Sequence, residues 1–168
     1  MHSPGKVVFS HGLESGPWGL KITALAEVAR SAGWSVESID YQDTRDPMTR
    51  VARLVDYCKG LDEPVLLVGS SMGAAVAAHA AASVPVSGVF LMATAVYVPG
   101  YEGMNPVPLT VPSVLVHGWR DEVIPYQNAL RFALESRAGY VLLDDDHGLA
   151  ASVPRLEQQF KKFLVLFG

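Results

Sequence analysis

The sequence contains a single cysteine, Cys58, among its 168 residues. One thiol cannot form a disulfide within the chain or supply a multi-cysteine zinc site, and it fits a reducing compartment. The sequence also lacks any apolar run approaching the roughly 20 residues that a membrane-spanning helix requires. Its first residues do not contain the apolar core of a signal peptide. We therefore expect a cytoplasmic protein that does not act in a membrane.

Charged residues are scarce, at 18% of the chain, and the positive ones are the minority. Thirteen lysines and arginines against seventeen aspartates and glutamates give a formal net charge of -4. Because the basic residues are scattered, nucleic acid and anionic membranes are poor partners. Hydrophobic residues, in contrast, make up 49% of the chain, as a well-buried interior requires. At this length we expect one domain that spans residues 1–168.

Short apolar runs bounded by turn residues alternate with longer stretches of helical spacing. Such runs are typical of strands covered on both faces. The alternation predicts an α/β fold with three layers, α/β/α, around a mostly parallel sheet of about six strands. The expected strands are Lys6–Ser10, Ser35–Ile39, Pro64–Val68, Val86–Met92, Ser113–His117 and Tyr140–Leu143. The expected helices are Leu20–Ala32, Asp46–Leu61, Met72–Ser83, Tyr126–Arg137 and Ala151–Phe167.

A Gly-x-Ser-x-Gly motif, Gly69-Ser70-Ser71-Met72-Gly73, lies between an expected strand and an alanine-rich helix. At such a position a serine occupies a sharp, strained turn and exposes its hydroxyl at the carboxyl edge of the sheet. In a chain with 15 glycines the motif alone is weak, and the alternative is a plain tight turn. The location between strand and helix favours Ser71 as a nucleophile.

A serine hydroxyl needs a base, and the base needs a group that orients it. His147 follows the last expected strand and is the candidate base, although a solvated loop histidine is the alternative. Asp121 follows the preceding strand and is the candidate acid, because a buried carboxylate there could accept the imidazole N–H. Glu122 is the adjacent rival, and the aspartates Asp144–Asp146 are more distant ones.

An acyl-transfer site also needs hydrogen-bond donors for the oxyanion that forms in the transition state. The backbone N–H of Met72, directly after the nucleophile, supplies one. The N–H of Leu13, in the glycine-bearing loop after the first strand, is the expected second donor. This loop could instead be an ordinary turn, and it lacks the spacing of a phosphate-binding loop.

These segments together resemble the α/β-hydrolase superfamily, in particular its small bacterial serine esterases that lack an inserted cap domain. The family orders its nucleophile, acid and base along the chain as Ser71, Asp121 and His147 occur here. The resemblance implies those three roles, a truncated fold without the extra hairpin of larger members, and no cofactor or metal. It is carried by His11-Gly12-Leu13, Gly69-Ser70-Ser71-Met72-Gly73, the segment from His117 to Pro125, and His147-Gly148.

Aromatic residues of the expected loops could form an apolar pocket for the substrate, or simply pack within their own loops. They are Trp18, Tyr97, Tyr101 and Trp119. The proline-rich stretch from Thr94 to Pro112 is too short for a helical cap, so we expect an open, shallow site. His11 and His117 are expected to hold the loops by local hydrogen bonds.

The sequence thus predicts a serine hydrolase that cleaves small carboxylic esters through an acyl-enzyme intermediate. A thioesterase or a peptidase would use the same residues, and a catalytically inactive binding protein could share the fold. A flavodoxin-like or nucleotide-binding protein would need a phosphate loop after the first strand. The expected partner is a small-molecule ester, with the chain a monomer or a small homo-oligomer.

Overall fold

Six parallel strands form one sheet in the computed structural model, which describes residues 2–168. The spatial order is β2-β1-β3-β4-β5-β6, and each of the five pairings is parallel. The strands are β1 (Lys6–Ser10), β2 (Ser35–Ile39), β3 (Val65–Ser70), β4 (Gly88–Met92), β5 (Ser113–Gly118) and β6 (Gly139–Leu143). This order places β3 and β4 at the centre and leaves β2 and β6 as edges.

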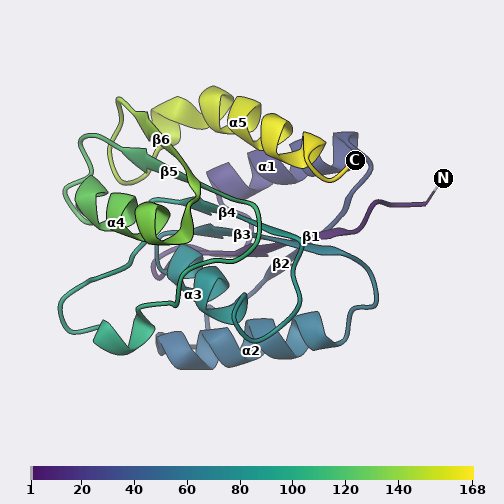
Figure 1. Ribbon diagram of the computed structural model, residues 1–168, viewed down its shortest axis with the longest axis horizontal. Coiled ribbons are helices and arrows are strands. Elements are labelled where there is room, and N and C mark those ends of the chain that lie inside the picture. The colour runs from purple at the N-terminus through teal and green to yellow at the C-terminus, as the bar shows by residue number, and fades with distance from the viewer. Residues whose placement is uncertain (1) are drawn as a thin grey trace.

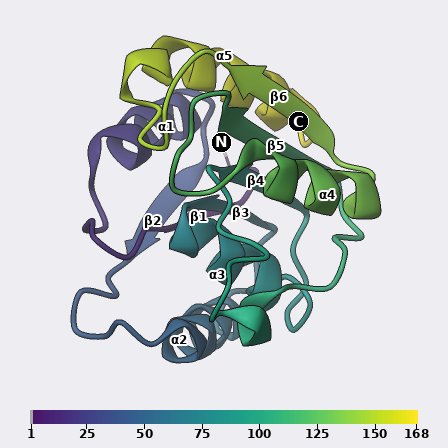
Figure 2. The same cartoon turned by 90° about the vertical axis from the view of Figure 1, so that its left-hand side faces the viewer.

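Helices cover both faces of the sheet, so the three-layer α/β/α prediction is confirmed (Figure 1). One face carries α1 (Leu20–Ser31) and α5 (Val153–Val165), which pack on each other. The other carries α2 (Pro47–Lys59), α3 (Met72–Ala80) and α4 (Tyr126–Ser136). Figure 2 shows this separation end-on, with α1 and α5 on the side of the sheet opposite α2 and α3.

Alternating side chains of the strands supply two separate cores. In β1, Val7 and Phe9 pack with α1 and α5, whereas Val8 packs with α2 and α3. All three side chains are fully buried. Both faces of the strand therefore need apolar residues, which is why the sequence shows continuous apolar runs instead of strict alternation.

Local signals explain where α2 begins. The side chain of Asp46 accepts a hydrogen bond from the backbone N–H of Thr49 at 2.8 Å, and Pro47 occupies the first helical turn. Such a cap satisfies a backbone donor that the helix itself leaves free. Asp46 thus precedes the helix instead of belonging to it.

The ends of several elements differ from the expectations by one to three residues. β3 continues through Gly69 and Ser70, because these residues still pair with Leu91 and Met92 of β4. α3 ends at Ala80, since the amide of Ser83 bonds to the carbonyl of Ala80 in a tighter turn. α5 starts only after a 3₁₀ turn at Ala150–Ser152.

The proline-rich stretch contains only a short 3₁₀ turn, Glu102–Met104, as regular structure. Asn105 accepts a hydrogen bond from the amide of Tyr97, and Ser136 of α4 accepts one from the amide of Leu109. The loop is therefore fastened to itself and to α4. In the part of the chain that the structure describes, no helix is both long and apolar enough to cross a membrane.

Candidate active site

The turn that carries Ser71 joins β3 to α3 at the carboxyl edge of the sheet. Ser71 has φ 56° and ψ −120°, a conformation that a residue with a side chain rarely adopts. Gly69 and Gly73 make the turn possible. A Cβ on Gly69 would meet the backbone of Gly73 and Ala74, and one on Gly73 would meet the carbonyl oxygens of Ser10 and His11. The motif thus lets β1, β3 and α3 approach closely while the serine projects outward.

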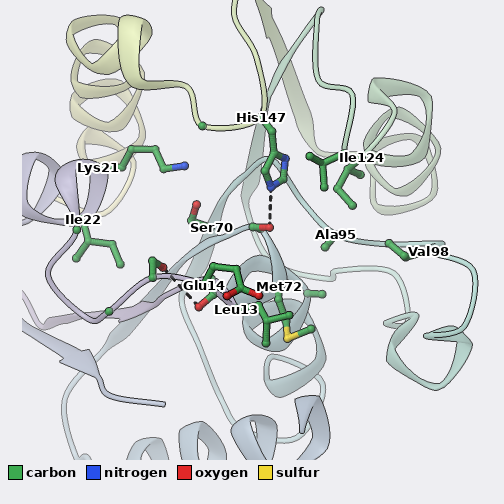
Figure 3. A pocket seen from close by; sticks show the side chains of 18 of the residues that line it. Leu13, Glu14, Lys21, Ile22, Ser70, Met72, Ala95, Val98, Ile124 and His147 are labelled. Carbon is green, nitrogen blue, oxygen red and sulfur yellow. Dashed lines mark hydrogen bonds between the residues drawn. The ribbon is translucent and has the colours of Figure 1, made fainter. Parts of the chain in front are cut away.

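A chain of hydrogen bonds links Ser71, His147 and Asp121. Figure 3 shows the first of these bonds as a dashed line that ends on the ring of His147. The Oγ of Ser71 lies 2.9 Å from Nε2 of His147, and Nδ1 of His147 lies 2.7 Å from Oδ2 of Asp121. Because a carboxylate only accepts, Nδ1 carries the proton and Nε2 presents its lone pair to the hydroxyl. The structure therefore brings together the three side chains that the sequence singles out, in the protonation pattern that a serine nucleophile requires.

The carboxylate of Asp121 is fully enclosed and held on both oxygens. Its Oδ1 accepts the amides of Val123 and Ile124 at 2.9 and 2.7 Å, and its side chain has no exposed surface. The rival Glu122 is exposed instead. The other rivals are also engaged away from the imidazole: Asp144 pairs with Arg120, Asp145 accepts the amide of Asp146, and Asp146 accepts that of Gly148.

A second histidine, His117, contacts the same carboxylate. Its Nε2 lies 2.8 Å from the carbonyl of Ile124 and 3.1 Å from Oδ2 of Asp121. Both neighbours are acceptors, so Nε2 carries the proton and donates to the Ile124 carbonyl while it lies close to the carboxylate. Burial lowers the pKa of His117, which favours the neutral ring. The expectation that His117 holds its loop agrees with these bonds, which also extend to the acid.

Two backbone amides face the space beside Ser71. Leu13 and Met72 both line the cavity there, and within the described residues neither amide is hydrogen-bonded to an acceptor. The amide of Met72 is also the first of α3, where the helix itself leaves N–H groups free. Two free donors in the same cavity as a serine hydroxyl are groups that a developing oxyanion could use.

Two side chains hold the carbonyl of the peptide group that joins Gly12 to Leu13. His11 accepts the amide of Tyr41 on Nε2 at 2.9 Å, so its Nδ1 carries the proton and donates to the Gly12 carbonyl at 2.8 Å. Arg50 donates to the same carbonyl at 3.1 Å. Because a trans peptide is planar, fixing its C=O directs the N–H of Leu13 the opposite way. The two donors therefore set the direction of this amide.

The sequence does not indicate that Arg50 is buried or that it supports the site. It lies in α2 among apolar neighbours, is only 1% exposed, and donates to the carbonyls of Gly12, Tyr41 and Thr44. Its guanidinium also lies over the ring of Tyr41, 5.1 Å from the centroid. Three separate carbonyls can be held together by one planar fork of donors, as only arginine provides.

A cavity of about 650 Å³ opens beside Ser71 and His147. This volume suits a drug-sized ligand, so the site is not the shallow one that the sequence predicts. Its walls come from the loop after β1, the start of α1, the turn before α3 and the proline-rich loop. Apolar side chains dominate, among them Leu13, Ile22, Met72, Val98, Tyr101 and Met104.

Of the four aromatic residues expected in the pocket, Tyr101 lines the cavity and the other three are held elsewhere. The ring of Trp18 lies under the guanidinium of Arg30, and Trp119 packs edge-on against Tyr126. Tyr97 donates to Glu135 of α4 at 2.7 Å. These three rings therefore have local partners and do not line the cavity, which agrees with the alternative that they pack within their own part of the fold.

Metal ligands do not gather at this site or at any other in residues 2–168, where no group of three or more His, Cys, Asp or Glu side chains could hold an ion.

Comparison with known proteins gives one family and several close folds. The family described as "Alpha/beta hydrolase family" matches residues 7–164. A solved protein of Xanthomonas campestris pv. campestris, assigned to the alpha/beta superfamily of hydrolases, is 35% identical with a TM-score of 0.90, covering 97% of this chain and 98% of that one. No curated protein matches the sequence significantly.

Two further solved structures share the fold at lower identity. The alpha/beta hydrolase domain-containing protein 10 from mouse has a TM-score of 0.83 at 22% identity, covering 97% of this chain and 90% of that one. Est1E from Butyrivibrio proteoclasticus has a TM-score of 0.80 at 19% identity, covering 98% and 88%.

Proposed function

The chain belongs to the alpha/beta hydrolase family, and on that basis we propose that it is a serine hydrolase that cleaves small carboxylic esters. The observation that carries this proposal is the hydrogen-bonded series from Ser71 through His147 to Asp121 beside an apolar cavity. Ser71 is the nucleophile, His147 the general base and Asp121 the group that orients the imidazole. Leu13 and Met72 contribute the oxyanion donors.

The first half of the reaction transfers the acyl group to Ser71. As Oγ attacks the ester carbonyl, Nε2 of His147 takes the hydroxyl proton, and Asp121 stabilises the imidazolium that forms. The amides of Leu13 and Met72 donate to the negative oxygen of the tetrahedral intermediate. His147 then gives its proton to the departing alcohol, and the acyl-enzyme remains.

The second half releases the acid. A water molecule beside His147 loses a proton to Nε2 and attacks the acyl-enzyme carbonyl, which regenerates the oxyanion in the same pair of amides. Collapse of this intermediate breaks the bond to Ser71, and the serine recovers its proton from the imidazolium. Every step uses only groups of the chain, the ester and water.

Thioesters and amides would pass through the same intermediates. An ester is the better proposal than an amide because the cavity is lined mainly by side chains that offer few polar contacts for a peptide backbone. The alternative of an inactive binding protein is disfavoured by Ser71 itself, because a strained backbone of this kind costs stability and is retained at functional sites.

Replacement of Ser71 by alanine tests the proposal. Wild type should hydrolyse ethyl butyrate in a pH-stat assay and should be labelled by a fluorophosphonate probe, and the Ser71→Ala variant should do neither. Ser83→Ala, which removes an exposed serine beyond the end of α3, is the control and should behave as wild type. Labelling that persists in Ser71→Ala would place the nucleophile elsewhere and would reject the proposal.

A further inference from the structure

Two acidic or basic side chains other than His147 line the cavity, Glu14 and Lys21. Glu14 is neutralised, because Arg45 donates to its two carboxylate oxygens at 2.8 and 3.4 Å. Lys21 is not. In the described part of the chain its ammonium forms no hydrogen bond, and no carboxylate oxygen lies within ion-pair distance of it.

The amine of Lys21 is partly removed from water, but no group of the described residues forms a hydrogen bond or an ion pair with it. Burial lowers the pKa of Lys21, and the carboxylates of Asp121, Asp145 and Asp146 act on it in the opposite direction from a distance. Those carboxylates are already bonded to His147 and to backbone amides. Lys21 is half-buried, so up to three of its N–H donors are partly removed from water and have no protein partner among the described residues.

The cavity has two sides of different chemistry. Figure 3 shows Lys21 and Ile22 of α1 on one side of His147, with the lysine amine turned toward the space next to the imidazole. Ala95 and Val98, which belong to the proline-rich stretch, lie on the other side. Tyr101 and Met104 of the same stretch also line the cavity. A ligand that spans the reacting serine therefore meets a cation at one end and apolar groups at the other.

We propose that the substrate is an ester that carries a carboxylate on the side of Lys21 and an apolar group on the side of the proline-rich loop. This inference rests on the proposed function and specifies its substrate class. A carboxylate would supply the acceptors that the half-buried ammonium lacks, and a charged hydrogen bond in an apolar cavity is stronger than one in water. The anionic group could belong to the acid or to the alcohol part of the ester.

Three esters of matched shape separate these cases. Ethyl butyrate has a terminal methyl group on each side. Ethyl hydrogen succinate replaces the acid-side methyl with a carboxylate, and carboxymethyl butyrate replaces the alcohol-side one. Their hydrolysis is followed in a pH-stat by wild type, Lys21→Gln, Lys21→Arg and, as a control for net charge, Lys161→Gln on the exposed face of α5.

We expect wild type to prefer at least one charged ester over ethyl butyrate. Lys21→Gln should lower kcat/KM for that ester about tenfold, or roughly 1.4 kcal/mol, mainly through KM. Its rate with ethyl butyrate should stay within about twofold of wild type. Lys21→Arg should retain the preference, and Lys161→Gln should match wild type. Equal losses for all three esters, or a wild type that disfavours both charged ones, would overturn the proposal.

Failure of the proposed function gives a different pattern. If wild type hydrolyses none of the esters, the hydrolase proposal fails, and the anion site is then judged by binding alone. Isothermal titration of the Ser71→Ala protein with the two charged esters should show binding that is lost when Lys21→Gln is added. Absence of binding, or binding that ignores Lys21, would exclude the anion site independently of turnover.

Discussion

At the scale of single residues, the surroundings of Asp121 distinguish it from every other carboxylate near the site. It is enclosed, it is hydrogen-bonded to His147 and to two amides, and His117 lies in contact with it. Asp121→Asn keeps the shape but presents an amide that can hold the imidazole in the wrong tautomer. We expect kcat to fall on the order of 10³–10⁴-fold with the fold retained.

The neighbouring Glu122→Gln is the matched control, since that side chain is exposed. Both variants are compared in ester hydrolysis and by circular dichroism. Equal activity of Asp121→Asn and wild type would remove Asp121 from the mechanism, whereas a loss confined to Glu122→Gln would assign the acid to its neighbour.

The two nitrogens of His11 make separable contributions. Asn at position 11 places an NH₂ group near the position of Nδ1 and can still donate to the Gly12 carbonyl. Gln instead reaches the position of Nε2 and can accept the amide of Tyr41, but it no longer fixes Gly12. If the direction of the Leu13 amide matters for the oxyanion, His11→Gln should lower kcat about tenfold with little change in KM.

His11→Asn should stay within about threefold of wild type in kcat, because it keeps the bond that orients the peptide. Thermal unfolding of both variants shows whether stability changes in parallel. A structural role alone predicts that kcat follows stability in the two variants. Activity that is lower in His11→Asn than in His11→Gln would contradict the proposed orientation of Leu13.

Residue types and their order along the chain are sufficient to select Ser71, Asp121 and His147, because each follows a recognisable apolar strand. The direction of a loop side chain is not encoded in the same way. Trp18 and Trp119 belong to loops near the site, yet Arg30 and Tyr126 hold their rings outside the cavity. Lys21 looks like an ordinary polar residue of an amphipathic helix, and only the assembled cavity shows that its amine faces inward.

At the scale of elements, the turn at Ser71 brings the backbone of α3 very close to the end of β1, at Gly73. Gly73 is helical, so helix propensity alone would favour alanine there by about 1 kcal/mol. The added methyl group would nevertheless meet the carbonyl oxygens of Ser10 and His11. We expect Gly73→Ala to lower the free energy of unfolding by roughly 1–3 kcal/mol, as overpacking of backbone against backbone does.

Urea denaturation measures this change, and Gly103→Ala is the control because nothing lies within 4 Å of its added Cβ. A stability of Gly73→Ala equal to or above that of wild type would show that α3 can move away from β1.

Element types follow well from the sequence, and element ends follow less well. All six strands can be identified from their apolar residues, and the runs are continuous in the central strands β3 and β4, which are buried throughout. The edge strands β2 and β6 are less buried. Asp46-Pro47 marks the start of α2. The end of β3 is different. Gly69 has low strand propensity, and it remains in the sheet because β1 and β4 pair with it on either side, while Ser70 pairs with Met92 of β4.

At the scale of the whole molecule, two buried neutral histidines couple stability to pH. Burial lowers the pKa of His11 and of His117 below the usual 6.5. As the pH falls, the unfolded chain therefore binds protons at these residues before the native state does. The free energy of unfolding should therefore be constant above about pH 7.5 and decrease as the pH falls through about 6.5.

Urea titrations between about pH 8 and pH 5 test this dependence. Removal of one group, in His11→Asn, should make the decrease less steep, whereas replacement of the exposed His2 by asparagine should leave it unchanged. A free energy of unfolding that does not vary over this range would mean that the two rings bind protons in the native state over the same pH range as in the unfolded chain.

The order of Ser71 and His147 along the chain has a consequence during synthesis on the ribosome. Ser71 and its base are separated by 76 residues, and the base comes second. A nascent chain that has completed β3 and α3 already holds the serine, but without an imidazole its hydroxyl is an ordinary alcohol. If Ser71 and His147 act as proposed, reactivity arises only when β5 and β6 have docked, and we expect an incomplete chain on the ribosome to leave the esters around it intact.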